Sequence, residues 1–271
     1  MTREDAEQIL AEAGAKGDDA FPLMEAALAC ALHEAPARDV GAVRTLCEQV
    51  SERLKHRLES ESAEEAIAET LSGDFRFNGD LLTWDDPDNT DLIAVAERRR
   101  GISVALGIFY LDAARRSGLP VEGVDFPGHF LLRIESAEGP LALDPFSEGR
   151  VVLPSELVRR ALRAGLTPDV ADRLDMLMAP VKDRAVLIRL QNQVFARAHN
   201  QGDYPRAERA AMRRALLDPA DHRPWIDVAA AREGQGALAG ALEALARAQA
   251  LDGGAAIAAR AARERVRLRL N

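Results

Sequence analysis

The sequence is poor in cysteine, lysine and aromatic residues, and it has no long apolar run. Its 271 residues include only 2 cysteines, Cys30 and Cys47, which cannot build a disulfide framework. No stretch of about 18 apolar residues is present to cross a membrane as a helix. The first ten residues, MTREDAEQIL, lack the basic and then apolar order of a secretory signal. We therefore expect a cytoplasmic protein with reduced thiols and no membrane partner.

The composition is that of an ordinary globular protein. Hydrophobic residues make up 47% of the chain and charged residues 29%, which excludes a disordered, collagen-like or low-complexity protein. At about 150 residues per domain, the length suggests two modest domains, or one domain with an appended array.

Acidic and basic residues are distributed unevenly. Residues 1–183 contain 20 Lys and Arg against 35 Asp and Glu, a net charge of −15, whereas residues 184–271 contain 15 against 9, a net charge of +6. The acidic segment argues against a nucleic-acid partner, because contacts to phosphate supply most of the affinity in such complexes. The basic segment is suited to an acidic partner or to the acidic segment of its own chain.

The first 72 residues have the apolar spacing of helices, with steps of three and four that place one apolar stripe on each helix. The stripes cover residues 9–13, 23–32 and 43–58. A shorter helix is predicted from Ala63 to Leu71, because Ser62 and Glu65 have the spacing of a capping box. We predict an N-terminal helical subdomain over residues 1–72.

Most aromatic residues lie between positions 75 and 146, where we expect the main core. They are Phe75, Phe77, Trp84, Phe109, Tyr110, Phe126, Phe130 and Phe146. A strongly helical run over residues 102–117 ends at Gly118-Leu119-Pro120, and three strands are predicted to follow it. The predicted strands are Val121–Phe126, Phe130–Ile134 and Leu141–Leu143. A helix followed by antiparallel strands predicts an α+β domain over residues 73–183.

An internal repeat occupies the last predicted segment, residues 184–271. Matching positions lie 34 residues apart, the period of tetratricopeptide repeats. The pairs are Gly202 with Gly236, Ala207 with Ala241, Leu217 with Leu251 and Asp218 with Asp252. One full and one degenerate repeat are fewer than the about three needed for independent stability. We therefore expect this all-α segment to dock on the core domain of its own chain.

A long central stretch resembles the bacterial SirB-one family. It reads DPDNTDLIAVAERRRGISVALGIFYLDAARRSGLPVEGVDFPGHFLLRI, and LALDPF follows it. The similarity is dense over residues 75–155, and the phrase FPGHFLLR with its following DPF is specific. The resemblance implies a transglutaminase-like, papain-like core of a helix and an antiparallel sheet, with tetratricopeptide repeats behind it.

This resemblance places a candidate catalytic triad on three residues. A transglutaminase-like core has a Cys at the start of its core helix, a His on the next strand and an Asp on the strand after that. Ser103, His129 and Asp144 occupy these positions. A helix N-terminus helps a thiol to ionise but cannot ionise an alcohol, whose pKa is far higher. A nucleophilic Ser103 would depend wholly on His129 as its base, with Asp144 holding the imidazole in the useful tautomer.

The same residues also have structural interpretations. Ser103 is suited to cap the helix by accepting a hydrogen bond from its first turn, and SirB-like relatives, as the resemblance implies, generally lack the cysteine and often have proline there. His129 and Asp144 form either a retained catalytic pair or an inherited pair left in a pocket. Asp144-Pro145 equally reads as a turn that ends a strand.

We expect neither a metal nor a cofactor. Cys30 and His33 are three residues apart and Cys47 and His56 nine apart, spacings that match no familiar zinc motif. The sequence contains no phosphate-binding glycine loop, no nucleotide fingerprint and no CxxC pair.

Two functional hypotheses result. The first is a non-catalytic transglutaminase-like protein that binds protein or peptide partners as a regulator or adaptor, with Tyr204, Arg206 and Arg213 in the repeats as the predicted protein-binding residues. The alternative is a Ser-His-Asp hydrolase or acyltransferase that acts on amide or ester bonds. The missing thiol favours the first, and the geometry between the Ser103 hydroxyl and the His129 ring discriminates between them.

Overall fold

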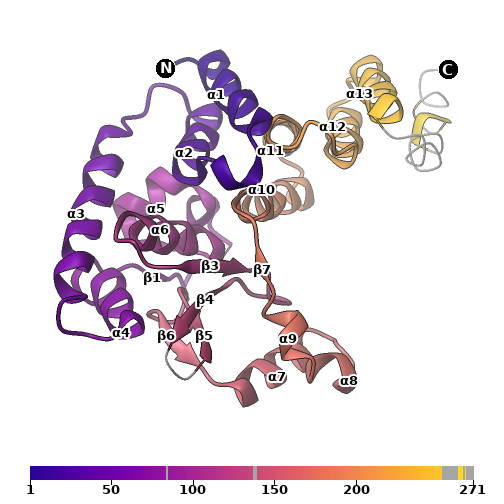
Figure 1. Ribbon diagram of the computed structural model, residues 1–271. Coiled ribbons are helices and arrows are strands. Elements are labelled where there is room, and N and C mark those ends of the chain that lie inside the picture. The colour runs from indigo at the N-terminus through magenta and orange to yellow at the C-terminus, as the bar shows by residue number, and fades with distance from the viewer. Residues whose placement is uncertain (84, 137–138, 252–261, 265, 267–271) are drawn as a thin grey trace. The chain divides into compact units, whose positions relative to one another are not determined.

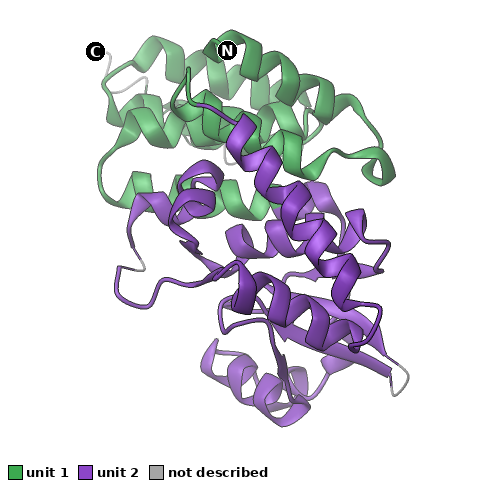
Figure 2. Ribbon diagram, turned by 90° about the vertical axis from the view of Figure 1, so that its left-hand side faces the viewer, with its two compact units in different colours: residues 1–38, 187–271 green, residues 39–186 purple. Residues whose placement is uncertain are grey.

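The computed structural model (Figure 1) describes residues 1–83, 85–136, 139–251, 262–264 and 266. The chain forms two compact units (Figure 2). Unit 1 comprises residues 1–38 together with residues 187–271, and unit 2 comprises residues 39–186. Trp84 and Asp252, which belong to the aromatic cluster and the repeat predicted above, lie outside the described residues.

These units divide the chain differently from the segments 1–72, 73–183 and 184–271 that the sequence suggests. The first two helices, α1 (Arg3–Ala15) and α2 (Leu23–Glu34), belong to unit 1, where α11 (Tyr204–Leu217) packs against both. The next two, α3 (Gly41–Arg57) and α4 (Ala63–Ala68), belong to unit 2. The expected N-terminal subdomain is therefore shared between the two units.

Unit 2 is built around the helix α6 (Ser103–Arg116), which is almost entirely buried. α3 packs along it, and the Ser117 hydroxyl after its last turn donates to the carbonyl of Ser51 on α3. The smaller helical elements of this part are the π-helical turn η2 (Glu69–Asp74), the 3-10 turn η3 (Pro87–Thr90) and α5 (Leu92–Arg98). Asp91 starts α5 by accepting hydrogen bonds from the first-turn N–H groups of Ile93 and Ala94.

The sheet of unit 2 has five antiparallel strands in the order β6-β5-β4-β3-β7. They are β3 (Val121–Val124), β4 (Leu131–Ser136), β5 (Gly139–Asp144), β6 (Arg150–Val152) and β7 (Pro180–Val181). The first three correspond to the predicted strands, and the short edge strands β6 and β7 were not predicted. A separate parallel pair joins β1 (Asn78–Gly79) to β2 (Arg100–Gly101) immediately before α6. A mixed helix and antiparallel sheet architecture is thus confirmed.

A helical excursion between β6 and β7 packs against the sheet. It contains α7 (Pro154–Arg163), α8 (Pro168–Ala171) and α9 (Leu174–Leu177). The apolar side chains of α7 join those of the sheet in one cluster, which includes Phe126, Leu131, Leu157 and Ala161. This packing brings the polar residues of α7 to the strand end at Asp144.

Unit 1 is entirely helical in its described part. Besides α1, α2 and α11 it contains most of α10 (Asp183–Asn200), together with α12 (Arg223–Gly234) and α13 (Leu238–Leu251). Neighbouring helices α11, α12 and α13 pack consecutively, with small residues such as Ala211, Ala229 and Ala241 buried between them. This arrangement of helical hairpins is compatible with the predicted tetratricopeptide repeats, which remain a prediction.

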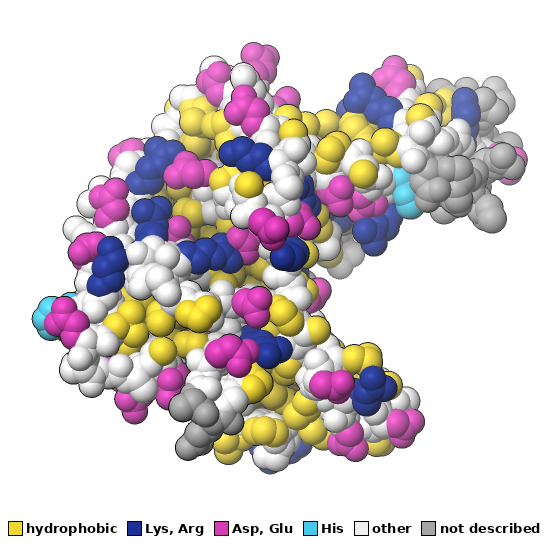
Figure 3. Space-filling view, viewed as in Figure 1, with side chains coloured by type: hydrophobic (Ala, Val, Ile, Leu, Met, Phe, Trp, Pro, Cys, Tyr) yellow, Lys and Arg dark blue, Asp and Glu magenta, His cyan; other side chains and the backbone are white. Residues whose placement is uncertain are grey.

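Acidic and basic side chains are interspersed over the face shown in Figure 3. Among the described residues, no helix combines the length and the apolar character needed to span a membrane. The most exposed large apolar side chains are Leu81 and Leu82, at 80% and 94% exposure. Their loop is held by Asp80, whose carboxylate accepts from the N–H groups of Leu82 and Thr83.

Candidate functional site

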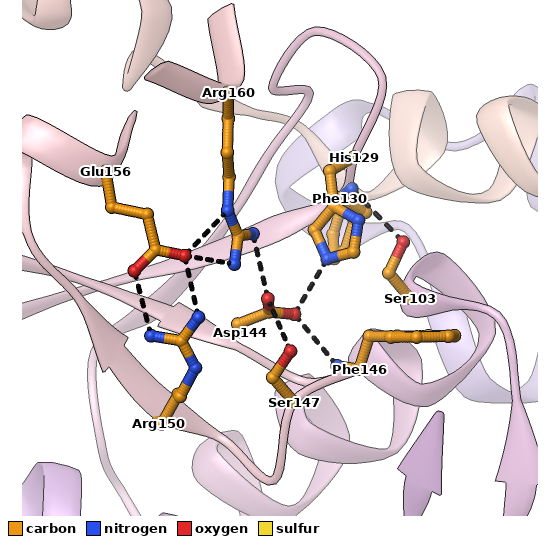
Figure 4. A network of polar contacts seen from close by, with 9 residues as sticks. All are labelled: Ser103, His129, Phe130, Asp144, Phe146, Ser147, Arg150, Glu156 and Arg160. Atoms are coloured by element: carbon orange, nitrogen blue, oxygen red, sulfur yellow. Dashed lines mark hydrogen bonds and ion pairs between the residues drawn. The ribbon is translucent and has the colours of Figure 1, made fainter. Parts of the chain in front are cut away.

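Three different elements bring the predicted triad residues to one place in unit 2 (Figure 4). Ser103 is the first residue of α6, and Asp144 is the last residue of β5. His129 lies in the turn just before β4, and not on the strand as predicted. The turn forms because Gly128 adopts a left-handed conformation with a φ of 73°, and the His129 N–H donates to the carbonyl of Phe126.

His129 and Asp144 form a direct pair. His129 Nε2 lies 2.7 Å from Asp144 Oδ1. An ionised carboxylate only accepts hydrogen bonds, so Nε2 carries the hydrogen and Nδ1 is the acceptor of the neutral ring. The imidazole also contacts the Phe146 ring edge-on, with the ring planes 85° apart and the centroids 5.9 Å apart. The structure therefore holds His129 in one tautomer and one orientation.

The Asp144 side chain is almost fully buried, and it accepts from three further donors. Oδ1 accepts from the N–H of Phe146 at 3.0 Å, and Oδ2 accepts from Ser147 Oγ at 3.0 Å and from Arg160 Nη1 at 2.8 Å. Burial opposes ionisation of the carboxyl, but the hydrogen bonds and charges of His129 and Arg160 outweigh it and keep the pKa of Asp144 well below its usual range. Asp144 is therefore ionised at neutral pH and places a negative charge at the centre of the site.

The negative charge of Asp144 continues into a chain of ion pairs. Arg160 on α7 also donates to Glu156, one helical turn before it, and Glu156 accepts from Arg150 on β6. Hydrogen bonds from Arg150 and Arg160 lower the pKa of Glu156 to about 2. None of these three residues was predicted as part of the site. The four-residue spacing of Glu156 and Arg160 on a helix was a signal for their pairing, but nothing local in the sequence connects Arg160 to Asp144.

The Ser103 hydroxyl is not engaged with His129. Ser103 Oγ accepts a hydrogen bond from the N–H of Phe130 at 3.2 Å (Figure 4), and no hydrogen bond joins it to the His129 ring in the described structure. The helix-cap interpretation is wrong, because Ile102 is the N-cap residue and Ser103 makes no capping bond to the first turn. Ser103 instead connects the start of α6 to the start of β4.

Close packing fixes the distance between α6 and the segment that carries His129. A Cβ atom at Gly107 would lie 2.4 Å from a ring carbon of Phe130. Only glycine allows the Phe130 ring to lie this close to the helix. The Phe130 side chain is fully buried, so the residue after His129 is anchored against the helix.

The predicted protein-binding residues lie in unit 1, and one of them is not at its surface. The Arg213 side chain is 2% exposed, donating to Gln191 Oε1 at 2.7 Å and to Glu34 Oε2 at 2.8 Å. Glu34 on α2 is the counter-ion of this buried guanidinium. This burial corrects the prediction that Arg213 is a protein-binding residue. Tyr204 and Arg206 begin α11, where the Tyr204 ring packs against His199 with the centroids 5.6 Å apart.

No group of three or more His, Cys, Asp or Glu side chains within the described part of the chain is arranged to hold a metal ion. Cys30 and His33 are both buried on α2. Burial raises the pKa of the Cys30 thiol to about 12, so it is a protonated core residue. His33 pairs through Nε2 with Glu7 at 3.0 Å.

The region that carries this helix, sheet and His–Asp pair is similar in sequence to a known superfamily. The sequence profile of the Transglutaminase-like superfamily matches residues 40–192, more than half of the chain. The chain belongs to this superfamily. The matched region begins with α3 and ends within α10, so it contains the whole of unit 2 except its first residue, Asp39.

The names of the similar proteins do not state an activity. A UPF0162 protein of Xylella fastidiosa (strain 9a5c) is 34% identical over 208 residues, which is 74% of this chain and 74% of the relative. A UPF0162 protein of Pseudomonas aeruginosa is 30% identical over 161 residues, 48% of this chain and 59% of the relative. The human F-box only protein 21 is 32% identical over 100 residues, 34% of this chain and 16% of the relative. No solved structure matches the chain.

Proposed function

We propose that the chain is a cytoplasmic, non-catalytic transglutaminase-like protein that binds other proteins as a regulator or adaptor. The proposal includes the SirB-one relationship and the tetratricopeptide character of the C-terminal helices, both of which rest on the sequence. It separates two roles. Unit 2 would keep the transglutaminase-like scaffold without its nucleophile, and the hairpins of unit 1 would supply a binding surface.

One observation carries the non-catalytic part of the proposal. The Ser103 hydroxyl bonds to the Phe130 main chain and not to His129. An alcohol at a helix N-terminus needs direct proton removal by a base before it can attack a carbonyl, because its pKa is far above that of a thiol. The described structure thus lacks the Ser–His hydrogen bond by which a base activates a serine nucleophile.

Chemical labelling tests this part. We expect a fluorophosphonate probe, which reacts with activated serine nucleophiles, to leave Ser103 unmodified in the wild-type protein, as measured by intact-protein and peptide mass spectrometry. The matched control is the His129→Ala variant, which should likewise remain unlabelled. Stoichiometric labelling of Ser103 that disappears in His129→Ala would contradict the proposal.

That contradicting result would support the alternative, a Ser-His-Asp hydrolase or acyltransferase. The observation that favours this alternative is the intact pair at 2.7 Å between His129 and Asp144. It presets the tautomer in which Nδ1 is able to accept a proton. In that case acyl transfer from activated esters should also depend on Asp144, since Asp144→Asn would lose the preferred tautomer.

Partner capture tests the binding part. Covalent crosslinking in the cells that make the protein, followed by affinity purification and mass spectrometry, should recover a reproducible set of proteins. The Ser103→Ala/His129→Ala double variant should recover the same set, because the candidate site is not used for chemistry. Recovery of no protein above the background of an unrelated bait would count against a protein-binding role.

A further inference from the structure

An open groove lies on unit 2 beside the short β1–β2 pair. Its volume is about 780 Å³, and it is lined by β1, the loop after β1, Arg100 on β2 and the turn between β5 and β6. The Phe146 ring forms part of its wall, packed so closely that a Cβ atom at Gly79 would lie 2.5 Å from a ring carbon. The lining includes neither Ser103 nor His129. The groove is therefore a feature distinct from the candidate site.

The loop after β1, residues 80–83, displays two leucines to solvent in a fixed conformation. Leu81 and Leu82 line the groove and are the most exposed large apolar side chains of the described residues. Asp80 accepts from the Leu82 N–H at 3.0 Å and from the Thr83 hydroxyl at 2.6 Å, and Asn89 donates to the Thr83 carbonyl at 2.6 Å. Exposed apolar groups of this kind mark an interaction surface. Because the loop is already ordered, little conformational entropy is lost when a partner covers it.

The groove also presents one cation and one anion that no ion pair within the described part of the chain neutralises. Arg100 is exposed, and its Nη1 donates only to main-chain carbonyls, those of Arg76 at 3.0 Å and Arg99 at 3.2 Å. Glu148 is exposed and has a left-handed φ of 62°. That conformation is unfavourable for a residue with a Cβ atom. A glutamate there gives up some backbone stability and places a carboxylate at the groove.

The other charged residues of the lining are already paired. Arg150 pairs with Glu156 at 2.7 Å, and Asp80 pairs with Arg98 at 3.2 Å. The charge that the groove offers to a partner is therefore balanced, with one positive and one negative group. A partner of a single charge sign would be attracted by one of these groups and repelled by the other.

A second copy of the same chain satisfies both groups. In a dimer with twofold symmetry, any contact from one residue to another is repeated in the opposite direction. Arg100 of each copy is then able to pair with Glu148 of the other. Each copy also supplies both an exposed leucine loop and a groove with an apolar wall, so the apolar contact is repeated in the same way.

We infer that the chain forms a twofold homodimer through this groove, with Leu81 and Leu82 of each copy covered by the groove of the other. Two equivalent ion pairs between Arg100 and Glu148 determine the register of the two copies. The inference goes beyond the proposed adaptor function and does not depend on it.

Sedimentation velocity of the whole chain over a series of concentrations measures the dissociation constant of the dimer. Leu82→Asp removes the apolar contact, and Arg100→Glu and Glu148→Arg each place like charges opposite each other at both ion pairs. Met176→Asp, a change of a 53% exposed apolar side chain outside the groove lining, is the control. Thermal melts identify any variant that has lost its fold.

We expect the wild type and Met176→Asp to dimerise, and each of the three groove variants to raise the dissociation constant by about tenfold or more. An equimolar mixture of Arg100→Glu and Glu148→Arg should recover a dimer, because both contacts between the two different variants again join opposite charges. Recovery in the mixture also shows that the two single variants are folded.

A folded wild type that stays monomeric at about 100 μM would overturn the inference. So would a dimer unaffected by the groove variants, or a mixture that stays monomeric although both variants are folded. A monomeric wild type whose crosslinked partners are lost in Leu82→Asp would assign the groove to a different protein and thereby also exclude the second copy.

Discussion

At the scale of single residues, Asp144 organises the candidate site. Four donors converge on its carboxylate, from His129, Phe146, Ser147 and Arg160. Two of them bring positive charge or the capacity for it. The site is therefore more than an inherited His–Asp pair, because α7 contributes a cation that lies outside the three triad positions.

We expect Asp144→Asn to lower the free energy of unfolding by about 3 kcal/mol, because it removes the buried charge on which four donors converge and one of the two carboxylates that pair with Arg160. Urea denaturation measures this loss. Glu135→Gln is the control, since Glu135 is 54% exposed in its ion pair with Arg133 and its removal should cost less than about 1 kcal/mol. Equal losses for the two variants would show that the Asp144 network stabilises the fold no more than an exposed ion pair does.

Ser103→Cys tests whether the site can still activate a thiol. The thiol would stand at the N-terminus of α6, whose partial positive charge lowers a thiol pKa, next to the segment that carries His129. We expect its alkylation by iodoacetamide to reach half of the maximal rate at a pH clearly below that of Ser117→Cys. Ser117 follows the last turn of the same helix, where the partial charge is negative. Indistinguishable pH profiles would refute an activating environment at position 103.

At the scale of elements, α1 and α11 are joined by an unusually close contact. A Cβ atom at Gly14 would lie 2.0 Å from the carbonyl oxygen of Leu216 in the main chain of α11. A main-chain atom cannot rotate away as a side chain can. Gly14 therefore determines how closely the first helix of unit 1 packs on α11.

Gly14→Ala should destabilise the protein by about 2–3 kcal/mol, because the added methyl group forces α1 away from α11. Gly17→Ala is the matched control, since Gly17 has ordinary extended backbone angles and no atom within 4 Å of the position that its added methyl group would take. It should change the stability by less than about 0.5 kcal/mol. Thermal melts measure the stability of both variants. An unchanged melting temperature for Gly14→Ala would show that α1 and α11 can move apart without loss of stability.

At the scale of the whole molecule, unit 1 is discontinuous in sequence. Arg209 and Arg213 on α11 both bind Glu34 on α2, with N–O distances of 2.6 and 2.8 Å. A fragment of residues 184–271 has neither α1 nor α2 and loses this counter-ion. We expect it to show little helical signal by circular dichroism and no cooperative melt. A sharp, monomeric transition of the fragment alone would show that the hairpins are autonomous.

Acid should unfold the protein partly through Glu34. Burial opposes ionisation of Glu34, but hydrogen bonds from Arg209 and Arg213 lower its pKa from 4.5 to about 2. A carboxyl whose pKa is lower in the folded state stabilises the fold above its unfolded pKa and loses that stabilisation as the pH falls toward the folded value. We expect a loss of up to about 3 kcal/mol between pH 4.5 and pH 2 from this group.

Chemical denaturation at a series of pH values measures that loss. Asp144, whose pKa is also lowered, adds to it in the same direction. Glu34→Gln should be less stable than the wild type at about pH 6 and should show a weaker pH dependence below about pH 4.5. A wild-type stability that stays constant from about pH 4.5 to about pH 2.5 would contradict both assignments.

Local signals in the amino-acid sequence are sufficient to predict the order of elements around the site. Glycine and proline predict the helix end at 118–120, and short apolar runs predict β3 to β5. Both signals arise between residues only a few positions apart in the chain. That Ser103, His129 and Asp144 meet at one place was implied by the family resemblance, and neither periodicity nor spacing shows it.

The contacts that those residues make, in contrast, depend on tertiary packing. In the folded chain the Ser103 hydroxyl accepts from the Phe130 N–H, and Arg160 reaches Asp144 from a helix 16 residues further along the chain. Arg213, predicted at a binding surface, forms an interior pair with Glu34, 179 residues away. Contacts of this kind depend on which helix faces pack together, and no spacing within one segment records that choice.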